Sequence, residues 1–260
     1  MLTIFTIVLN GMPRIAQHLE TFSKLPFPWR WQIVEGVAAP RHCTAWCRQV
    51  PAEFHREWLS VDGTTAYLDG IKDSRVSVIR GKMPWDGKIE MINAALQGVE
   101  DGVVMEIDAD EIWTAQQLAA IYQVLAQRQA GDAMQFSCRV FVGPRKIVTT
   151  KVGFGSMPYE WFRAWRWGPG VAFVKHEPPE LNCRGSICSR EQTARAGLIF
   201  DHYAYETEAQ VRFKEVFYGY SGLTENWRRL QEVRGEVQLC RFFPWLKDQP
   251  WVIADDLPCR

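Results

Sequence analysis

The sequence has no excess of charge of either sign, because 30 Lys and Arg side chains balance 30 Asp and Glu side chains across its 260 residues. General nucleic-acid binders usually carry a basic excess, so this balance argues against a nucleic acid as partner. The sequence also lacks an apolar run of about 18 residues, which a membrane-spanning helix needs. The apolar run at residues 2–9 is too short and lacks the flanks of a signal peptide. We therefore expect a cytoplasmic protein whose only approach to a lipid phase is peripheral contact at the inner face of a membrane.

The sequence contains no Cys-x2-Cys pair, the sharp signature of a structural zinc site. Its 7 cysteines are an odd number and follow no signal peptide, which favours reduced thiols over a disulfide framework. The alternative is a zinc site that combines His42, Cys43 and Cys47 with Cys183 and Cys188, at the looser spacings C-x3-C and C-x4-C. Small buried or surface thiols are the simpler interpretation.

What the sequence does have is enough apolar surface for a core, with 47% hydrophobic residues and 12 tryptophans. Apolar, β-branched runs alternate with segments of helical period, which is typical of a doubly wound α/β sheet. The predicted strands are residues 3–9, 31–34, 76–79, 103–107 and 198–203, and the predicted helices are residues 14–23, 65–71, 88–98, 114–128, 206–220 and 225–233. Residues 133–142 and 146–150 suggest a strand pair, and residues 37–60 an insertion or long functional loop. The predicted fold is therefore α/β, a mostly parallel sheet flanked by helices, with a helical C-terminal extension.

An acidic segment follows the predicted strand 103–107. Asp108, Asp110 and Glu111 lie at the carboxyl end of that strand, where α/β sheets usually bind ligands. Strand alternation predicts that Asp108 and Asp110 face the same side. Hard divalent cations such as Mg²⁺ or Mn²⁺ prefer oxygen ligands and typically take one or two carboxylates plus substrate phosphates. The alternative is a solvated acidic turn that caps the next helix.

Five motifs along the chain occur in the order in which a known family has them. They are Thr6-Ile7-Val8-Leu9-Asn10, Asp62-Gly63-Thr64, Trp85-Asp86-Gly87-Lys88 with Asn93-Ala94-Ala95-Leu96, Ile107-Asp108-Ala109-Asp110-Glu111, and Phe162-Arg163 through His176-Glu177. Over residues 3–180 the sequence resembles the inverting family 2 glycosyltransferases of the GT-A fold, especially the branch of the lipopolysaccharide-core glucosyltransferases. It departs from the family pattern at Leu9-Asn10-Gly11, where the family has Lys-Asn-Glu, and at Glu35, where the family has Asp.

The resemblance implies a hexosyltransferase of cell-envelope biosynthesis. Such an enzyme moves a sugar from a nucleotide diphosphate sugar, UDP-linked by default, to a hydroxyl of a glycan or lipid-linked acceptor. It implies a catalytic domain at 1–205, with a nucleotide-sugar-binding half at 1–112 and an acceptor half at 113–205. The helical extension is residues 206–260.

The resemblance also assigns roles to individual residues. Mn²⁺ or Mg²⁺ would be held by Asp108 and Asp110, with His202 as a further ligand, and would neutralise the leaving diphosphate. Glu177, with His176 beside it, is the first candidate for the base that takes the acceptor proton, ahead of Asp110 and Glu111. The residues expected to bind the donor are Leu9, Asn10, Glu35, Lys88, Asp108 and Arg163, with Arg166 a weaker candidate.

Most of these residues have a plain structural alternative. His176-Glu177 is also typical of a polar turn, Glu35 of a turn cap, and His202 of a core histidine held by a hydrogen bond. Trp161, Trp165 and Trp167 are expected mainly in the core, with at least one lining the acceptor cleft.

Two other functions fit parts of the pattern. A sugar nucleotidyltransferase would need a glycine-rich, basic phosphate loop after the first strand, and Asn10-Gly11-Met12-Pro13-Arg14 is a poor example. A non-catalytic nucleotide- or carbohydrate-binding module would keep the fold without turnover.

Overall fold

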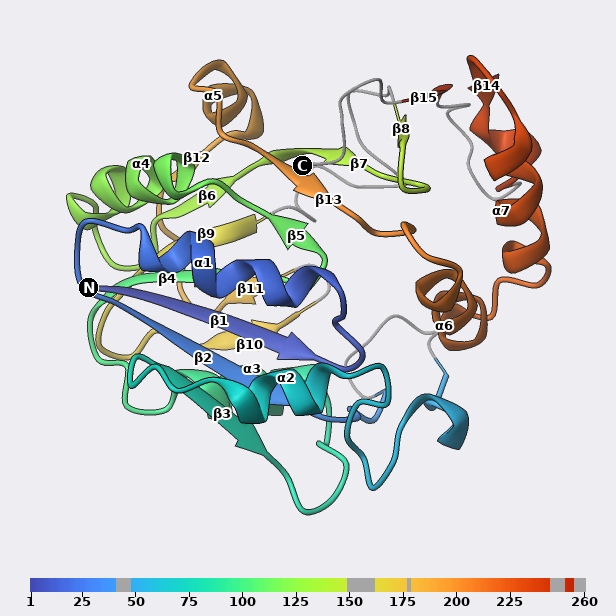
Figure 1. Cartoon of the computed structure of the whole chain (residues 1–260). Coiled ribbons are helices and arrows are strands. Elements are labelled where there is room, and N and C mark those ends of the chain that lie inside the picture. The colour runs from blue at the N-terminus through green and yellow to red at the C-terminus, as the bar shows by residue number, and fades with distance from the viewer. Residues whose placement is uncertain (41–47, 149–161, 177–178, 244–250, 255–260) are drawn as a thin grey trace.

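The computed structural model describes residues 1–40, 48–148, 162–176, 179–243 and 251–254. Its centre is a seven-stranded sheet with the strand order β12-β6-β9-β4-β1-β2-β3 (Figure 1). These strands are β1 (Leu2–Val8), β2 (Trp29–Glu35), β3 (Val76–Arg80), β4 (Gly102–Glu106), β6 (Ala133–Gln135), β9 (Phe162–Trp167) and β12 (Ile187–Cys188). Strands β1 to β4 pair in parallel, and β9 runs antiparallel between β4 and β6. The predicted α/β class, with its mostly parallel sheet, is confirmed.

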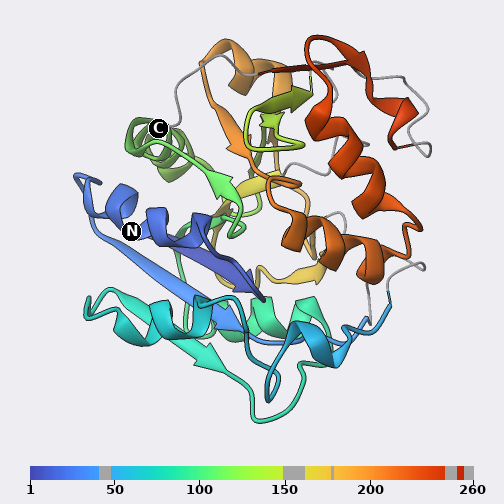
Figure 2. The same cartoon turned by 45° about the vertical axis from the view of Figure 1, so that its right-hand side comes forward.

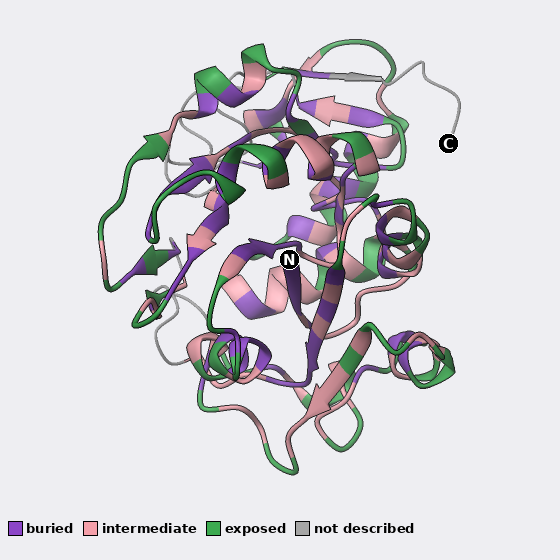
Figure 3. Cartoon of the chain, turned by 90° about the vertical axis from the view of Figure 1, so that its left-hand side faces the viewer, coloured by how far each residue is buried: buried purple, intermediate pink, exposed green. Residues whose placement is uncertain are grey.

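Helices cover both faces of this sheet. They are α1 (His18–Ser23), α2 (Thr64–Gly70), α3 (Lys88–Leu96) and α4 (Ala115–Ala126), with a 3₁₀ turn η1 (Arg14–Gln17) before α1. Apolar residues of α1, α2 and α4 belong to one core cluster, and those of α3 belong to another. Alternation along β1 explains the split, because Ile4 packs into the first cluster and Phe5 into the second. Figure 3 shows buried residues concentrated along the central strands.

Helix α4 begins where the sequence predicts it. The Thr114 hydroxyl accepts a hydrogen bond from the Gln117 amide, and the Gln117 side chain in turn accepts one from the Thr114 amide. This capping box satisfies two donors at the helix start that would otherwise have no partner. The helix buries Leu118, Ile121 and Leu125 against the sheet. Its placement fixes the connection that runs from β4 past the acidic segment.

Two smaller sheets lie beyond the central one. The first has the order β5-β13-β7, with β5 (Glu111–Ile112), β7 (Ser137–Val140) and β13 (Ile199–His202), and the second has the order β14-β15-β8, with β8 (Lys146–Val148), β14 (Val237–Gln238) and β15 (Trp251–Ala254). A hairpin joins β10 (Phe173–Lys175) and β11 (Glu180–Leu181). Strands occur in both predicted ranges, 133–142 and 146–150, as β6, β7 and β8. Their main partners differ from the prediction, since β7 pairs with β13 and β8 with β15, and the two ranges meet at an isolated antiparallel bridge between Phe141 and Ile147.

The C-terminal part carries helices α6 (Glu208–Tyr218) and α7 (Leu223–Glu232), after the short α5 (Arg190–Arg195), and ends with η3 (Leu239–Arg241) and β15. Its apolar residues form a separate core cluster with Val140, Val142 and Val148 from β7, β8 and the loop between them. Both Figure 1 and Figure 2 place α6 beside the carboxyl end of β1. The helical extension thus reaches the edge of the sheet where ligands are expected. The domain boundary at 205/206 stays a prediction.

No helix among the described residues is long and apolar enough to cross a membrane. Within the predicted insertion at 37–60, the structure describes residues 37–40 and 48–60, with the 3₁₀ turn η2 (Ala52–Phe54), while residues 41–47 lie outside the described part of the chain. His42, Cys43 and Cys47, half of the alternative zinc site, lie in that outside segment.

Candidate functional site

The acidic segment forms a tight turn between β4 and β5. Strand β4 ends at Glu106, and the Glu111 amide donates to the carbonyl of Asp108 at 3.0 Å. The Thr6 hydroxyl of β1 donates to the Ile107 carbonyl at 2.7 Å and anchors the segment from the neighbouring strand. Because the strand stops before Asp108, strand alternation does not govern the directions of the two aspartates, and they have different partners. Asp108 faces β9, whereas Asp110 faces β13 and α6.

Arg163 on β9 binds the acidic turn from within the protein. Its Nε donates to Glu111 at 2.7 Å, its Nη2 donates to Asp108 at 2.9 Å, and its Nη1 lies 3.9 Å from Glu106. The side chain is only 7% exposed. This planar fork holds three carboxylates in fixed positions. Its geometry gives no support to the predicted contact between Arg163 and a donor diphosphate.

Burial and mutual repulsion set the protonation of this group. Burial raises the pKa of Glu111 well above its usual range, although Arg163 acts against it, and burial likewise raises the pKa of Asp108. The pKa of Asp110 moves the other way. Burial alone would raise it, but the neighbouring His202 and Lys214 outweigh that effect and hold it below its usual range. Asp110 therefore stays ionised at neutral pH.

His176 lies against the buried end of β4. Its Nε2 is 2.9 Å from the Glu106 carboxylate, which is fully buried. Burial would raise the pKa of Glu106, but His176 and Arg163 together lower it. His176 is thereby tied to the same network as the acidic turn. Glu177, the predicted base, lies outside the described residues, so its role stays a prediction.

Asp110 is surrounded by groups from the far C-terminal half of the chain. The Nε2 of His202, at the end of β13, lies 3.5 Å from one oxygen of Asp110. The Nζ of Lys214, on α6, lies 3.8 Å from the other oxygen. The sequence predicts His202 at this position, whereas Lys214 was missed. The signal that could have found it is a lysine between Val211 and Phe217, two buried positions of the same helix.

The donor atoms fit a divalent cation that is completed by its substrate. Among the described residues, no three His, Cys, Asp or Glu side chains form a ready-made metal cage. Asp110 and His202 nevertheless present two ligand atoms close together, and the Asp108 side chain is 30% exposed beside them. Mg²⁺ commonly binds to one or two carboxylates plus phosphates and water rather than to an all-protein cage. The set of side chains therefore suits an ion of this kind, with Asp110 as its principal ligand.

A second group of predicted site residues lies at the ends of β1 and β2. The Asn10 side chain donates to the Phe54 carbonyl and accepts from the Val61 amide, so the 54–61 segment covers it. Glu35 is fully buried and accepts from the Ser60 amide, the Thr65 hydroxyl and Arg80. Leu9 packs against a small cluster that includes Val37 and Phe217. These residues contact the chain itself, and their contact with a donor stays a prediction.

The backbone amides that follow β1 also donate hydrogen bonds to side chains of the protein itself. Those of Asn10, Gly11 and Met12 donate to the side chains of Ser60, Thr64 and Asp62, at 3.0, 2.8 and 2.8 Å. The Asp-Gly-Thr motif thus holds the loop that follows β1. A phosphate-binding loop needs such amides to point at its ligand.

Lys88, at the start of α3, has its Nζ 6.0 Å above the Phe217 ring of α6. It also adds its charge to the surroundings of Glu106 and Lys214. Lys88 therefore lies near the acidic turn, and its contact with a donor stays a prediction.

Trp165 and Trp167 follow their structural interpretation, and Arg166 lies away from the acidic turn. Trp165 and Trp167 are 2% and 5% exposed and pack on Phe173, so neither lines a cleft. Trp161 lies outside the described residues. Arg166 pairs with Asp101 at the opposite end of β4 from the acidic turn.

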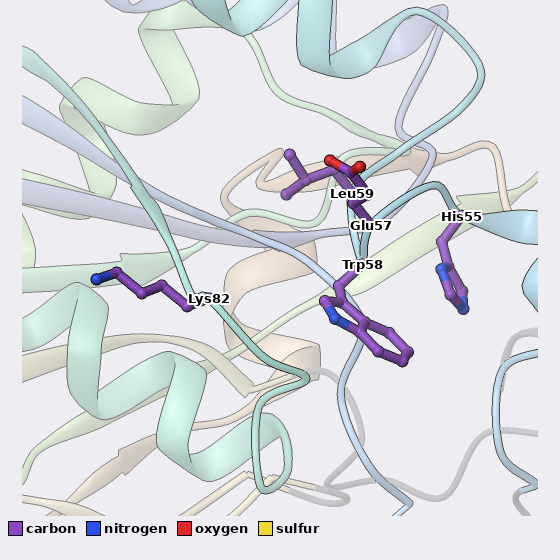
Figure 4. A pocket seen from close by; sticks show the side chains of 6 residues that line it. His55, Glu57, Trp58, Leu59 and Lys82 are labelled. Atoms are coloured by element: carbon purple, nitrogen blue, oxygen red, sulfur yellow. The ribbon is translucent and has the colours of Figure 1, made fainter.

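A cavity of about 580 Å³ lies between the 55–59 segment and the loop after β3 (Figure 4), and its lining residues are His55, Glu57, Trp58, Leu59, Gly81 and Lys82. The rings of His55 and Trp58 stack with their centroids 5.0 Å apart. Glu57 and Trp58 have φ of 50° and 70°, and the backbones of Arg56 and Leu59 exchange two hydrogen bonds of 2.9 Å around them. Such left-handed backbone costs about 1–3 kcal/mol per non-glycine residue, and it concentrates at ligand sites.

The comparisons with known proteins concern the fold only. No family model and no curated protein sequence matches the chain. Solved structures of TarS from S. aureus match at low identity. The complex of its residues 1–349 with UDP is 11% identical, with a TM-score of 0.47 over 86% of this chain and 69% of that one. The complex with UDP-GlcNAc is 12% identical, with a TM-score of 0.42 over 64% of this chain and 45% of that one. In a third match to residues 1–349, this chain covers 46% of the TarS chain, less than half its length.

Proposed function

We propose that the protein is a metal-dependent inverting glycosyltransferase that transfers a hexose from a nucleotide diphosphate sugar to a hydroxyl of a glycan or lipid-linked acceptor. The observation that carries the proposal is the placement of Asp110. It lies at the carboxyl end of a central parallel strand, stays ionised, and has His202 and Lys214 at its two oxygens. A carboxylate in these surroundings suits an ion that binds a diphosphate.

The leaving diphosphate gains negative charge as the bond to the sugar breaks. A divalent ion on Asp110, with Asp108 and His202 beside it, would supply the Lewis acid that stabilises this charge. The protein's own part is to keep Asp110 deprotonated and to fix the acidic turn through Arg163. Buried neighbours that do not move during the reaction make such stabilisation effective.

The cavity beside His55 and Trp58, named the aromatic cavity, is the proposed place for the nucleoside end of the donor. Its residues follow β2 and β3, and the acidic turn follows β4, so both lie at the carboxyl edge of the same sheet. Neighbouring strands are about 4.8 Å apart, so the three steps from β4 to β3 span about 14 Å. An extended nucleoside diphosphate covers such a distance. The stacked faces of His55 and Trp58 suit a nucleobase.

A sugar nucleotidyltransferase is disfavoured by the loop after β1. The amides of Asn10, Gly11 and Met12 already donate to side chains of this chain, so they do not point at a ligand. For the acceptor side, we keep Glu177 as the proposed base, with His176 held in place by Glu106.

The test is titration calorimetry with UDP, GDP and CDP, in the presence and absence of Mn²⁺. We expect one nucleoside diphosphate to bind only with the metal, and Asp110→Asn to weaken that binding by about 100-fold, the usual scale for removing one charge-stabilising group. Asp101→Asn is the matched control, because Asp101 pairs with Arg166 away from the site. Binding that is equal with and without metal, or unchanged in Asp110→Asn, would contradict the proposal. Metal-dependent binding without any sugar transfer or donor hydrolysis would indicate a non-catalytic module.

A further inference from the structure

Among the described residues of the C-terminal part, Lys214 is the lysine that the fold brings to the acidic turn. It comes from the middle of α6, yet its Nζ lies 3.8 Å from Asp110 and 4.6 Å above the Tyr205 ring. Its side chain is only 20% exposed, close to the 21% of Asp110 itself. A lysine on a helix surface would normally extend into water. Here it is directed along the protein toward a carboxylate.

The position is electrostatically costly for the lysine. Its side chain is only 20% exposed, and the carboxylate oxygen that faces its ammonium is that of Asp110, at 3.8 Å. The ammonium therefore depends on the carboxylates of the turn. Any ligand that takes over Asp110 removes the main compensation for Lys214 and leaves a buried cation in need of an anion.

A divalent cation would make this change. Asp110 has one oxygen beside His202 and the other beside Lys214. An ion bound to Asp110 would repel the ammonium, since both are positive. The lysine stem is a flexible four-carbon chain, which lets the ammonium move by a few ångströms without moving the helix. A diphosphate held by the same ion offers the nearest anionic oxygens.

We propose that Lys214 is an exchangeable counter-ion: it pairs with Asp110 in the free protein and moves to the diphosphate of the donor when a divalent cation binds Asp110. The proposal rests on the proposed function for the identity of the diphosphate. It assigns the extension a direct part in donor binding, through a residue of α6. It also makes metal binding and diphosphate binding favour each other, because the lysine that the metal displaces is the one that the phosphate recruits.

The test separates the two halves of the exchange with the variant Lys214→Met, which keeps the apolar stem and removes the charge. Mn²⁺ binding without nucleotide is measured by electron paramagnetic resonance. We expect Lys214→Met to bind Mn²⁺ about tenfold more tightly than the wild type, because the competing ammonium is gone. UDP binding at saturating Mn²⁺ is measured by calorimetry. Here we expect a loss of about 10- to 100-fold, as for other hydrogen bonds between charged groups, and near-complete recovery in Lys214→Arg.

Arg212→Met is the matched control. Arg212 is on the same helix but is 59% exposed and pairs with Glu53, so its loss should change neither affinity. Circular dichroism and thermal unfolding establish that each variant is folded. The proposal is overturned if Lys214→Met binds Mn²⁺ no more tightly than the wild type, or if it binds UDP with Mn²⁺ equally well. If the wild type binds Mn²⁺ but no nucleoside diphosphate, the proposed function fails, and tighter Mn²⁺ binding by Lys214→Met still decides whether the lysine competes at Asp110.

Discussion

Two clusters of polar residues stand at the carboxyl edge of the central sheet, and they differ in how completely the protein satisfies them. At the ends of β1 and β2, Glu35 is fully buried and accepts hydrogen bonds from Arg80, Thr65 and the Ser60 amide. At the end of β4, Asp108 and Asp110 keep 30% and 21% of their side chains exposed. Both clusters occupy the edge that favours ligand binding.

The difference shows that location at a strand end does not make a site by itself. The first cluster has one carboxylate and a matching set of donors, so it holds the chain together. The second has two fully buried carboxylates, Glu106 and Glu111, beside two that reach the surface, and Arg163 compensates only part of this charge. Charge that the protein leaves partly exposed and partly compensated is available to a cation.

The largest expected effect comes from removing Arg163, which binds the carboxylates of the acidic turn. Arg163→Met removes the ion-pair partner of the buried Glu111 and leaves the buried Glu106 with His176 alone of its two ion-pair partners. Breaking a buried ion pair in this way costs about 3–5 kcal/mol of folding free energy. Urea unfolding monitored by circular dichroism measures the loss, provided that the slope of the transition is unchanged.

Arg80→Met is the comparison on the other cluster. Arg80 is 27% exposed, and Glu35 keeps its hydrogen bonds from Thr65 and Ser60. We expect a loss of about 1–3 kcal/mol, the usual cost of one missing partner of a charged group. A loss for Arg80→Met that equals or exceeds that for Arg163→Met would show that the two clusters are equally dependent on their arginines.

The second prediction concerns pH. His18 is 3% exposed behind the acidic turn, and its Nε2 lies 3.0 Å from the Glu111 carbonyl. Burial lowers the pKa of His18 to about 4, against the effects of Glu111 and Asp110. Between about pH 4 and 6.5, His18 is therefore protonated in the unfolded chain but not in the folded protein. This contribution to stability is present above about pH 6.5 and is lost as the pH falls toward about 4.

This contribution amounts to about 3 kcal/mol, because each pH unit between the pKa of His18 in the folded and in the unfolded chain corresponds to about 1.4 kcal/mol. The free energy of unfolding in urea is measured at intervals from about pH 4.5 to 7.5, across the window of the titration, for the wild type and for His18→Gln. The variant keeps a donor for the Glu111 carbonyl but cannot titrate, so the difference between the two profiles isolates His18. Parallel profiles would show that His18 does not contribute, and that the carboxylates alone set the pH dependence of this region.

The smallest expected effect tests whether the cavity beside His55 and Trp58 binds the nucleoside of the donor. Trp58→Ala removes one of the two stacked rings of the aromatic cavity. Base stacking on an aromatic side chain contributes about 1–3 kcal/mol, so UDP affinity at saturating Mn²⁺ should fall by about tenfold or more. Trp58→Phe keeps an aromatic face and should recover most of it. Unchanged affinity in Trp58→Ala would place the nucleoside elsewhere.

The sequence was informative where local rules decide the structure. The apolar β-branched run at residues 3–9 and the helical period at residues 114–128 predicted a strand and a helix close to the positions where β1 and α4 occur. The acidic motif was found from local context and His202 from the family resemblance, and the fold brings Asp110 and His202 together. Alternation is no guide at Asp108 and Asp110, because it assumes that the strand continues, whereas β4 ends at Glu106.

The internal contacts of Arg163 could not be read from the sequence, for a different reason. A sequence shows that an arginine is present but not how many buried carboxylates surround it. Glu111, Asp108 and Glu106 are more than fifty residues before it in the sequence, and only the antiparallel pairing of β4 with β9 brings them within reach. Leu9 and Glu35 present the same difficulty, since the covering 54–61 segment is not visible as such in the sequence.

By itself, the sequence determined the alternation of strands and helices, the parallel core of the sheet and the acidic turn at one strand end, because these depend on short-range periodicity and on residue chemistry. Only the tertiary structure decided which carboxylates are satisfied and which are open. Lys214 reaches Asp110, and Glu35 is closed off, through contacts between segments far apart in the sequence. Protonation and ligand binding depend on burial and on the distance to opposite charges, which the folded chain alone sets.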